Sequence, residues 1–330
     1  MAPITRVAIA GASGALGLVV LKHLVEAGFD VTVLSRAPGK LPAEYASSAK
    51  EIVVDYGSKA SLEAALRGQD AVVSTLSDFG GYEAQKPLVE AAVSAGVSRF
   101  IPSEFGSNLQ HPVVRTLPFA TLKVEVEEML IREASSSAHT ANPITYTFIY
   151  TNIFLDWGLE EGFTADLENK TATLYNGGST PLSYTRLPTI AQAVVAVLRR
   201  PAETANKIVR IHDGILTQKE FLDAIQEVTG PWTIDEDDVV ALQARADEAY
   251  AKGILNYWVI NGWIMRASHS PGFGAGFVEN ENKLLGLKEH STDEMKELVR
   301  TLVKDIVENK KYRGSFAKAL LSARKDSVGA

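Results

Sequence analysis

Cysteine is absent from this 330-residue chain, which excludes disulfide bonds, thiolate metal sites and a cysteine nucleophile. Histidine is scarce, and its residues form no HxH or HExxH pattern, so we predict that the protein binds no metal ion. The six histidines are His23, His111, His139, His212, His269 and His290.

Long apolar runs are also lacking. No stretch is apolar over the length that a bilayer requires, and neither a basic leader nor an apolar signal core precedes the first predicted strand. We therefore expect a cytoplasmic protein that does not associate with membranes. Clustered positive charge is missing too, since the net charge is −7 and the pI is about 5.5. Nucleic acid is accordingly not an expected partner.

Glycine, in contrast, is concentrated in one informative place. A short apolar strand, 7–10, runs directly into Gly11, Gly14 and Gly17, and 18–27 is then typical of a helix. Glycine is needed at such a turn because the chain bends tightly, the backbone approaches a pyrophosphate and the helix packs close to the strand. The helix N-terminus offers free N–H groups to phosphates. The pattern predicts a dinucleotide-binding turn.

The end of the second strand, 30–34, indicates which dinucleotide is bound. In NAD-binding units an Asp or Glu stands there and binds the ribose 2′-hydroxyl, whereas here Ser35 and Arg36 follow the strand and Lys40 is close behind. A guanidinium forms paired hydrogen bonds with a phosphate and stacks on adenine. We predict NADPH as the cofactor; the alternative for Arg36 is a solvated loop residue.

The first 155 residues alternate strands and helices as a parallel sheet requires. The predicted fold is α/β, a Rossmann-type doubly wound parallel sheet. We predict an NADP-binding domain over 1–155 and a smaller, mostly helical substrate lobe over 156–330, with some strands returning to the main sheet. The polar stretch 135–143 is expected to be an exposed insertion. Further predicted strands are 52–55, 71–75, 99–102 and 146–150; further predicted helices are 61–66, 88–95 and 122–134.

In the second half the regular alternation lapses. Strands are predicted at 171–175 and 207–211, and helices at 187–199, 217–229, 238–252 and 292–309. Thr217, with Glu220 three residues on, forms a capping box at the start of its helix. The stretch 254–277 is predicted to be a flexible, glycine-punctuated segment that either packs in the core or lines a pocket for a flat organic substrate. Its large side chains are Tyr257, Trp258, Trp263, Met265, Phe273 and Phe277.

Around the fifth strand the sequence resembles a known family. The stretch RFIPSEFG at 99–106, Lys123 in the next helix and TNIF at 151–154 resemble the isoflavone reductase-like branch of the NmrA-like family of atypical short-chain dehydrogenases. That branch includes phenylcoumaran benzylic ether reductases and pinoresinol-lariciresinol reductases. The resemblance covers the first 155 residues well, and its PSEFG element is specific.

The resemblance implies a role for each matching position. Lys123 would act in proton transfer and touch the nicotinamide ribose. The remaining implied cofactor contacts are the pyrophosphate turn at Gly11, Ser13, Gly14, Ala15, Leu16 and Gly17, the 2′-phosphate site at Ser35 and Arg36, the cofactor-facing strand end at Thr75 and Leu76, the nicotinamide border at Ser103, Glu104 and Phe105, and the flanks of the nicotinamide ring at Asn152 and Phe154.

The residues themselves also favour Lys123 and Glu104 as the catalytic pair. In wider short-chain dehydrogenases a tyrosine precedes the lysine by four residues, but here that position is Phe119, so the lysine transfers the proton or only anchors the ribose. Glu104 follows a central strand at the edge where ligands bind, and it could move protons or pair with Lys123. The alternatives are a solvent-facing lysine and a carboxylate that caps a loop.

The leading hypothesis is an NADPH-dependent reductase of an aromatic or polycyclic small molecule, with Lys123 in proton transfer. A second is a non-redox acid–base catalyst, such as a cyclase, that binds NADP(H) and uses Glu104 or Lys123. A third is an NmrA-like dinucleotide-sensing regulator, which would need neither an aromatic pocket nor the lysine. A homodimer is compatible with the sequence, which leaves open the substrate, the direction and the stereochemistry.

Overall fold

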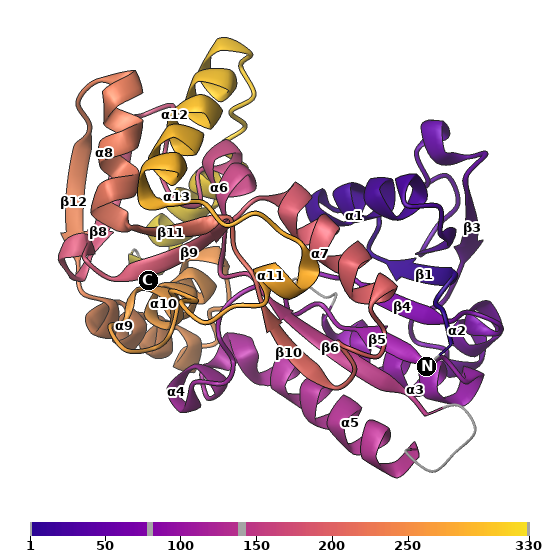
Figure 1. Ribbon diagram of the computed structural model, residues 1–330. Helices are drawn as coiled ribbons and strands as arrows, with labels where there is room; N and C mark the ends of the chain where they lie inside the picture. The colour runs from indigo at the N-terminus through magenta and orange to yellow at the C-terminus, as the bar shows by residue number, and fades with distance from the viewer. Residues whose placement is uncertain (1, 78–81, 138–142, 329–330) are drawn as a thin grey trace.

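The computed structural model describes residues 2–77, 82–137 and 143–328. Its centre is a seven-stranded sheet in which every neighbouring pair is parallel, with helices on both faces (Figure 1). This confirms the predicted doubly wound sheet. In spatial order the strands are β10 (Lys207–Arg210), β6 (Thr145–Tyr150), β5 (Arg99–Ile101), β4 (Ala71–Ser74), β1 (Arg6–Ala10), β2 (Asp30–Ser35) and β3 (Ala49–Val53).

The central strand β1 shows why these strands are continuous apolar runs. Val7 and Ile9 point into one core and Ala8 and Ala10 into the other, and all four side chains are buried. A strand that is covered on both faces has no solvent side to carry polar residues. Helices α1 (Ala15–Glu26) and α7 (Leu187–Arg199) cover one face, and α2 (Lys59–Leu66), α3 (Gln85–Ala95) and α5 (Thr121–Ser137) cover the other.

The second lobe contains more strand than its sequence predicts. It holds a three-stranded and a two-stranded sheet, packed among helices. The strands are β7 (Ile153–Phe154), β9 (Pro181–Thr185) and β11 (Gly214–Thr217), then β8 (Thr171–Tyr175) and β12 (Thr233–Asp237); the helices are α6 (Leu155–Glu161), α8 (Gln218–Thr229), α9 (Val239–Ala251), α10 (Tyr257–His269), α11 (Asn282–Leu285), α12 (Thr292–Glu308) and α13 (Ser315–Val328), with the short α4 (Pro112–Arg115) beside the larger lobe. Strand β10 and helix α7 follow residue 155 in the chain, yet they belong to the main sheet and to the helix layer that covers it. The domain boundary at residue 155 therefore stays a prediction.

The prediction of a flexible segment over 254–277 is wrong, because most of it is the helix α10. Asn256 caps this helix, and its side chain accepts a hydrogen bond from the N–H of Val259 at 3.1 Å. Gly262, which argued for flexibility, lies inside the helix, where a Cβ would come 2.8 Å from the Cβ of Ala246. Glycine is there because α10 packs closely on α9.

One local prediction is confirmed and two element boundaries differ from those predicted. The capping box of α8 forms as expected, with Thr217 and Glu220 bonding each other's backbone. Strand β3 begins three residues earlier than predicted and ends at Val53. Helix α5 continues to Ser137, so the predicted insertion at 135–143 is helical at its start, and its residues 138–142 lie outside the described residues.

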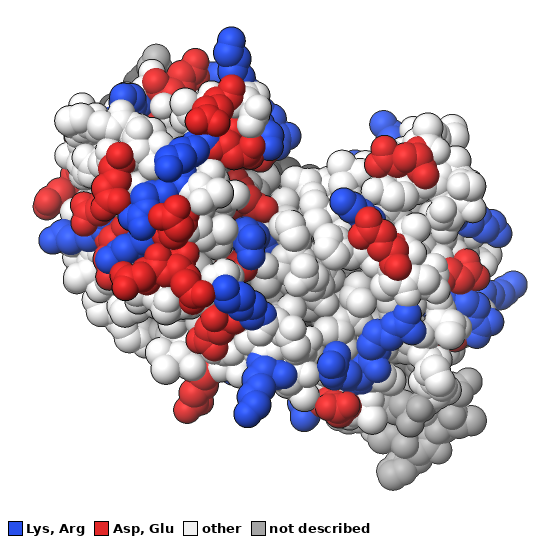
Figure 2. Space-filling model, turned by 45° about the horizontal axis from the view of Figure 1, so that its top comes forward, with Lys and Arg blue, Asp and Glu red and all other residues white. Residues whose placement is uncertain are grey.

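The surface differs between the lobes. Figure 2 shows a notch between them on this face, with charged side chains gathered over the smaller lobe. Many of these charges are paired, for example Arg300 of α12 with Glu227 of α8 at 2.6 Å. Among the described residues, no helix is both long enough and apolar enough to cross a membrane.

Candidate functional site

The glycine turn joins β1 to α1, and close backbone contacts require its glycines. Gly11 has a φ of +85°, in the left-handed region that favours glycine. A Cβ on Gly17 would lie 2.1 Å from the carbonyl oxygen of Gly11, so any side chain there would force the helix away from the turn. Thr75, at the end of the neighbouring strand β4, packs against the turn, and its hydroxyl donates a hydrogen bond to the carbonyl oxygen of Ala10 at 2.9 Å. A Cβ on Gly11 would meet the backbone of Thr75 at 2.7 Å.

The first turn of α1 is open to an anion. Gly14 is the N-cap and provides no side-chain cap, and no acidic residue stands in the first turn. Ser13, Gly14 and Ala15 are exposed, with Leu16 half-buried behind them. The free N–H groups of a helix N-terminus bind phosphates. The structure therefore brings the predicted pyrophosphate residues together around one accessible helix end.

An open cleft with a cavity volume of about 90 Å³ leads from this turn to the end of β2. Arg36 and Lys40 are basic, and no lining residue is acidic, so the cleft suits a dinucleotide that carries a 2′-phosphate. Burial raises the pKa of Tyr56 to about 12, so this phenol stays neutral in the cleft. The lining residues are Gly11, Ala12, Ser13, Val33, Leu34, Ser35, Arg36, Lys40, Tyr56 and Leu76.

The loop at the basic end of the cleft is fixed by Glu51, a residue that the sequence does not single out. Its carboxylate accepts hydrogen bonds from the N–H groups of Gly39 at 2.9 Å, Lys40 at 2.8 Å and Leu41 at 3.2 Å. Three bonds to consecutive residues hold the main chain that carries Lys40. Glu51 comes from the neighbouring strand β3, and this pairing of strand and loop is visible only in the folded chain.

Lys123 is buried rather than solvent-facing, which excludes the alternative weighed from the sequence. Its side chain leaves α5 and donates a hydrogen bond from Nζ to the carbonyl oxygen of Glu104 at 2.7 Å. The ring centroid of Tyr82 lies 5.0 Å from Nζ. A Cβ on Gly106 would come 3.7 Å from Nζ, so this glycine leaves space beside the ammonium. The lysine thus sits at the carboxyl end of β5, on the same sheet edge as the glycine turn.

Glu104 meets Lys123 through its main chain, not through an ion pair of the side chains. Its carboxylate is enclosed, and neither oxygen has a hydrogen-bond partner in the described part of the chain. Burial raises the pKa of Glu104 to about 8, opposed by the positive charge of Lys123.

The other predicted nicotinamide contacts have structural partners of their own. The N–H of Ser103 donates to Oε1 of Gln85 at 2.8 Å. Phe105 is buried in the core beneath α7, and Phe154 packs edge-on against Trp157. Asn152 has a φ of +52°, and its amide donates to the carbonyls of Ser183 at 3.3 Å and Ala275 at 3.1 Å. Their roles toward a cofactor stay predictions.

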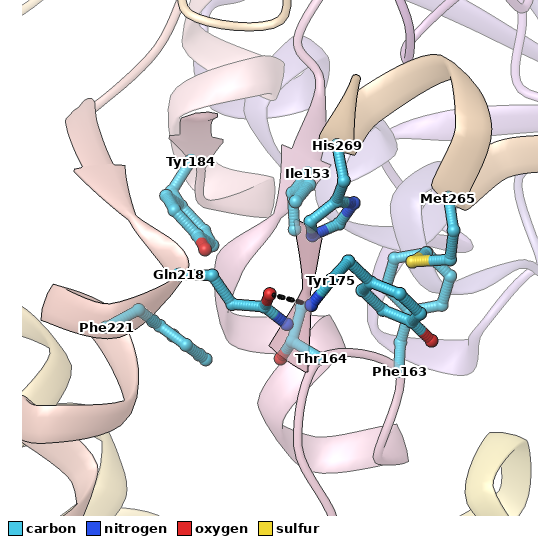
Figure 3. Close-up of a pocket in the computed structure, with 9 residues that line it drawn as sticks. All are labelled: Ile153, Phe163, Thr164, Tyr175, Tyr184, Gln218, Phe221, Met265 and His269. Carbon is cyan, nitrogen blue, oxygen red and sulfur yellow. Dashed lines mark hydrogen bonds between the residues drawn. The ribbon is translucent and has the colours of Figure 1, made fainter. Parts of the chain in front are cut away.

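A second, nearly filled hollow lies in the smaller lobe, with a cavity of about 10 Å³ (Figure 3). Tyr184 and Phe221 stack at a centroid distance of 5.0 Å on one side, and Tyr175 and His269 meet edge to face at 4.9 Å on the other. Burial lowers the pKa of His269 to about 4, so its ring is neutral. The lining residues are Ile153, Phe163, Thr164, Tyr175, Tyr184, Gln218, Phe221, Met265 and His269.

Main-chain hydrogen bonds link the loop beside Lys123 to the strand that leads into the pocket. Gly106, which borders Nζ, accepts hydrogen bonds at its carbonyl from the N–H groups of Thr151 at 3.2 Å and Asn152 at 2.9 Å. The next residue, Ile153, lines the pocket. Met265 and His269 come from the aromatic stretch that the sequence proposed for a pocket, whereas Phe163, Tyr184 and Phe221 carried no signal. Strand alternation in β9 could have found Tyr184.

These features define a Rossmann-type α/β protein with a dinucleotide turn and a buried lysine at the sheet edge. The model of the NmrA-like family matches residues 4–235, and the chain belongs to this family, which confirms the resemblance. It is 30% identical over 307 residues to the oxidoreductase poxI of Penicillium oxalicum, covering 87% of this chain and 91% of that protein. It is 31% identical over 303 residues to the oxidoreductase aprR of Aspergillus flavus, covering 88% and 97%.

Solved structures share the fold. Leucoanthocyanidin reductase from Vitis vinifera, in a binary complex with NADPH, has a TM-score of 0.69 at 20% identity, covering 90% of this chain and 99% of that chain. Triphenylmethane reductase of Citrobacter sp., complexed with NADP(H), has a TM-score of 0.67 at 21% identity, covering 90% and 99%. At these identities the likeness shows the fold.

Proposed function

We propose that this protein is an NADPH-dependent reductase that reduces a neutral, flat aromatic small molecule. The observation that carries the proposal is the enclosed ammonium of Lys123 on the sheet edge that also presents the glycine turn. A buried lysine at the sheet edge where ligands bind can donate a proton to a reacting ligand. Two fungal relatives are named oxidoreductases, and solved structures of the same fold contain NADPH or NADP(H), which supports this choice.

The chain's own residues would hold the cofactor in an extended pose along the sheet edge. The turn at Gly11 and Gly14 binds the pyrophosphate at the open end of α1, and Arg36 with Lys40 binds the 2′-phosphate. Bound NADPH supplies a hydride. Lys123 holds the proton that completes the reduction.

The pocket favours a neutral aromatic substrate. None of its nine lining residues is charged at neutral pH, because the only titratable ring among them that could charge there, His269, is kept neutral by burial. A carboxylate or phosphate would find no counter-charge in it. Aromatic walls on two sides suit a flat ring. The cavity between them is only about 10 Å³, room for about one water, so we expect these side chains to move apart when a ring enters.

The proposal is tested first by titrating the purified protein with NADPH and with NADH, following nicotinamide fluorescence. We expect tighter binding of NADPH. Arg36→Ala should weaken NADPH by roughly 10- to 100-fold, because it removes charge-assisted hydrogen bonds worth about 1.5–3 kcal/mol, and should leave NADH nearly unchanged. The matched control is Arg67→Ala, at the exposed end of α2. Binding of neither nucleotide would overturn the proposal.

The reaction itself is tested with a panel of neutral aromatic acceptors. Loss of nicotinamide absorbance together with a reduced product supports the reductase. Product formed without a loss of nicotinamide absorbance would instead identify a non-redox enzyme that binds NADP(H) and in which Lys123 acts as an acid–base catalyst. Nucleotide binding with no turnover of any acceptor, together with a partner captured only at one NADP to NADPH ratio, would identify a regulator.

A further inference from the structure

Two buried glutamates flank Lys123, and their surroundings are opposite. Glu104 follows β5 and provides the carbonyl that Lys123 contacts. Glu127 lies one helical turn beyond Lys123 on α5, on the same face. Both side chains are enclosed, at 1% and 0% exposure. Enclosed carboxyls next to a lysine on a sheet edge are unusual enough to require a physical account.

Glu127 is held by direct hydrogen bonds. The hydroxyl of Tyr150 donates to its Oε1 at 2.5 Å, and Arg115 donates to its Oε2 at 2.9 Å. The Tyr150 hydroxyl accepts in turn from the amide of Gln110 at 2.9 Å. Burial raises the pKa of Glu127, and these two donors hold that rise back. A carboxylate with a guanidinium and a phenol on its two oxygens is stabilised as the anion.

Glu104 has no such donors. Within residues 2–77, 82–137 and 143–328, neither of its carboxyl oxygens has a hydrogen-bond partner. The charged or titratable groups that face it are Lys123 and Glu127 from α5, Arg115 from α4 and Tyr150 from β6. Burial is the largest influence and raises its pKa to about 8, Lys123 and Arg115 lower it, and Glu127 raises it further. When the surroundings of two neighbouring carboxyls push their pKa values apart, one stays protonated and the other is the anion. Here Glu104 is the protonated acid and Glu127 is the anion.

We propose that Glu104 holds the proton that re-protonates Lys123 after each turnover, and that Glu127, held as a carboxylate by Arg115 and Tyr150, keeps that proton on Glu104. This rests on the proposed function, in which Lys123 gives a proton to the substrate. Both glutamates are positioning residues, because Glu104 acts on the substrate through Lys123 and Glu127 acts through Glu104. Nζ contacts the main-chain carbonyl of Glu104, and the proposal requires that the side chain of the same residue turns toward Nζ during the proton transfer.

The proton balance is complete. The hydride adds to a substrate carbon, and an N–H bond of Lys123 breaks as its proton joins the reduced substrate. The O–H bond of Glu104 then breaks and a new N–H bond forms on Lys123, which leaves an ammonium beside a carboxylate. Because Glu104 is enclosed, the proposal requires the site to open after product release, when a proton from solvent restores its O–H bond. Each turnover therefore takes up one proton from solvent, and no further oxidant or reductant is needed.

The test is an infrared titration of the full-length protein without cofactor or substrate. A protonated carboxyl has a C=O stretch that a carboxylate lacks. We expect wild type to show this band at pH 7 and to lose it with a midpoint near 8, and we expect Glu104→Gln to lack it. Absence of the band at pH 7, or its presence in Glu104→Gln, would overturn the proposal.

A second variant pair tests the role of Glu127. Glu127→Gln removes the charge that raises the pKa of Glu104, so the midpoint should move down. Glu128→Gln is the matched control, because Glu128 is the next residue of α5, is exposed and pairs with the same Arg115 at 3.1 Å. It should leave the midpoint in place. Where Glu127→Gln does not fold, Tyr150→Phe removes one of the two donors that hold Glu127 as an anion, and a smaller downward shift is expected. Equal midpoints in all folded variants would refute the role of Glu127.

These spectra need no turnover, so their outcome is separate from that of the proposed function. A carboxyl band that titrates as expected in a protein that oxidises no NADPH would refute the reductase and leave the asymmetry of the two glutamates standing. In an active enzyme, kcat of wild type should fall above the midpoint of Glu104, while KM changes little. Glu104→Gln should have a lower kcat without that pH dependence.

Discussion

The two lobes build their binding surfaces from different parts of the chain. The larger lobe uses backbone: a left-handed glycine, the open N-terminus of α1 and a Cβ-free position at Gly17. The smaller lobe uses side chains, since its pocket is walled by aromatic rings from four separate elements (Figure 3). Backbone geometry tolerates almost no substitution, whereas side-chain walls can change while the fold persists. Under the proposed function, the cofactor is bound by the larger lobe and the substrate is chosen by the smaller one.

The largest effect is expected from Gly17→Ala. Its Cβ would lie 2.1 Å from the carbonyl oxygen of Gly11, so the turn must shift, and we expect no measurable NADPH binding and a loss of roughly 1–3 kcal/mol in the free energy of unfolding. Gly14→Ala is the comparison, because its φ of −79° is ordinary and its Cβ would meet protein no closer than 3.4 Å. It should unfold like wild type, so any lost binding would come from contact with the nucleotide. Wild-type binding by Gly17→Ala would show that the turn does not hold the cofactor.

The next effect separates binding from chemistry. Lys123→Met should lower kcat by about 10²–10⁴-fold, as expected for loss of a general acid, while NADPH affinity changes by only a few-fold. The control is Lys86→Met on α3, a half-exposed lysine that pairs with Glu125 of the same helix layer. It should keep full activity. Stopped-flow measurement of hydride transfer provides the readout, and a Lys123→Met enzyme with wild-type kcat would remove this lysine from the mechanism.

The same contrast explains what the sequence could predict. The features that need a particular backbone geometry lie close together in the chain. They are the strand before Gly11, the glycine spacing and the missing acid after β2. The sheet and the cofactor cleft can therefore be predicted from short sequence patterns. Lys123 and Glu104 are predicted from a family motif, supported by the missing tyrosine at residue 119 and by the position of Glu104 after a central strand. Their contact was expected between side chains, and it is made by a carbonyl instead.

The remaining site residues meet only through tertiary structure. Tyr150 and Arg115 reach Glu127 from different elements, and no spacing along the chain announces this. Of these residues, only Glu127 could have been predicted from the sequence to lie near Lys123, because it stands four residues after Lys123 on a helix. The flexible segment was mispredicted because glycine content was weighed above the cap at Asn256 and the helical spacing of the aromatic residues.

A smaller effect would sharpen the assignment of the pocket. The hydroxyl oxygen of Thr164 lines it and has no hydrogen-bond partner among the described residues. Thr164→Val should therefore leave the free energy of unfolding within about 0.5 kcal/mol of wild type and change KM for a polar aromatic substrate several-fold. Thr189→Val is the opposite case, since Thr189 donates to Asp213 at 2.9 Å outside the pocket. It should cost about 1–3 kcal/mol and leave KM unchanged. Equal KM values for Thr164→Val and wild type would place the substrate elsewhere.

The smallest effect concerns the neutral character of that pocket. Burial lowers the pKa of His269 to about 4 from an ordinary 6.5, so the unfolded chain binds a proton at a higher pH than the native one. The contribution of His269 to stability is complete above pH 6.5 and is lost as the pH falls toward 4, by about 3 kcal/mol in all. His269→Gln should lose less stability over this range than wild type. Denaturant unfolding at a series of pH values measures the difference. Parallel curves for His269→Gln and wild type would mean that burial does not keep this ring neutral. The pocket could then bind a charged ligand. The cofactor cleft, which is built from backbone, would be unaffected.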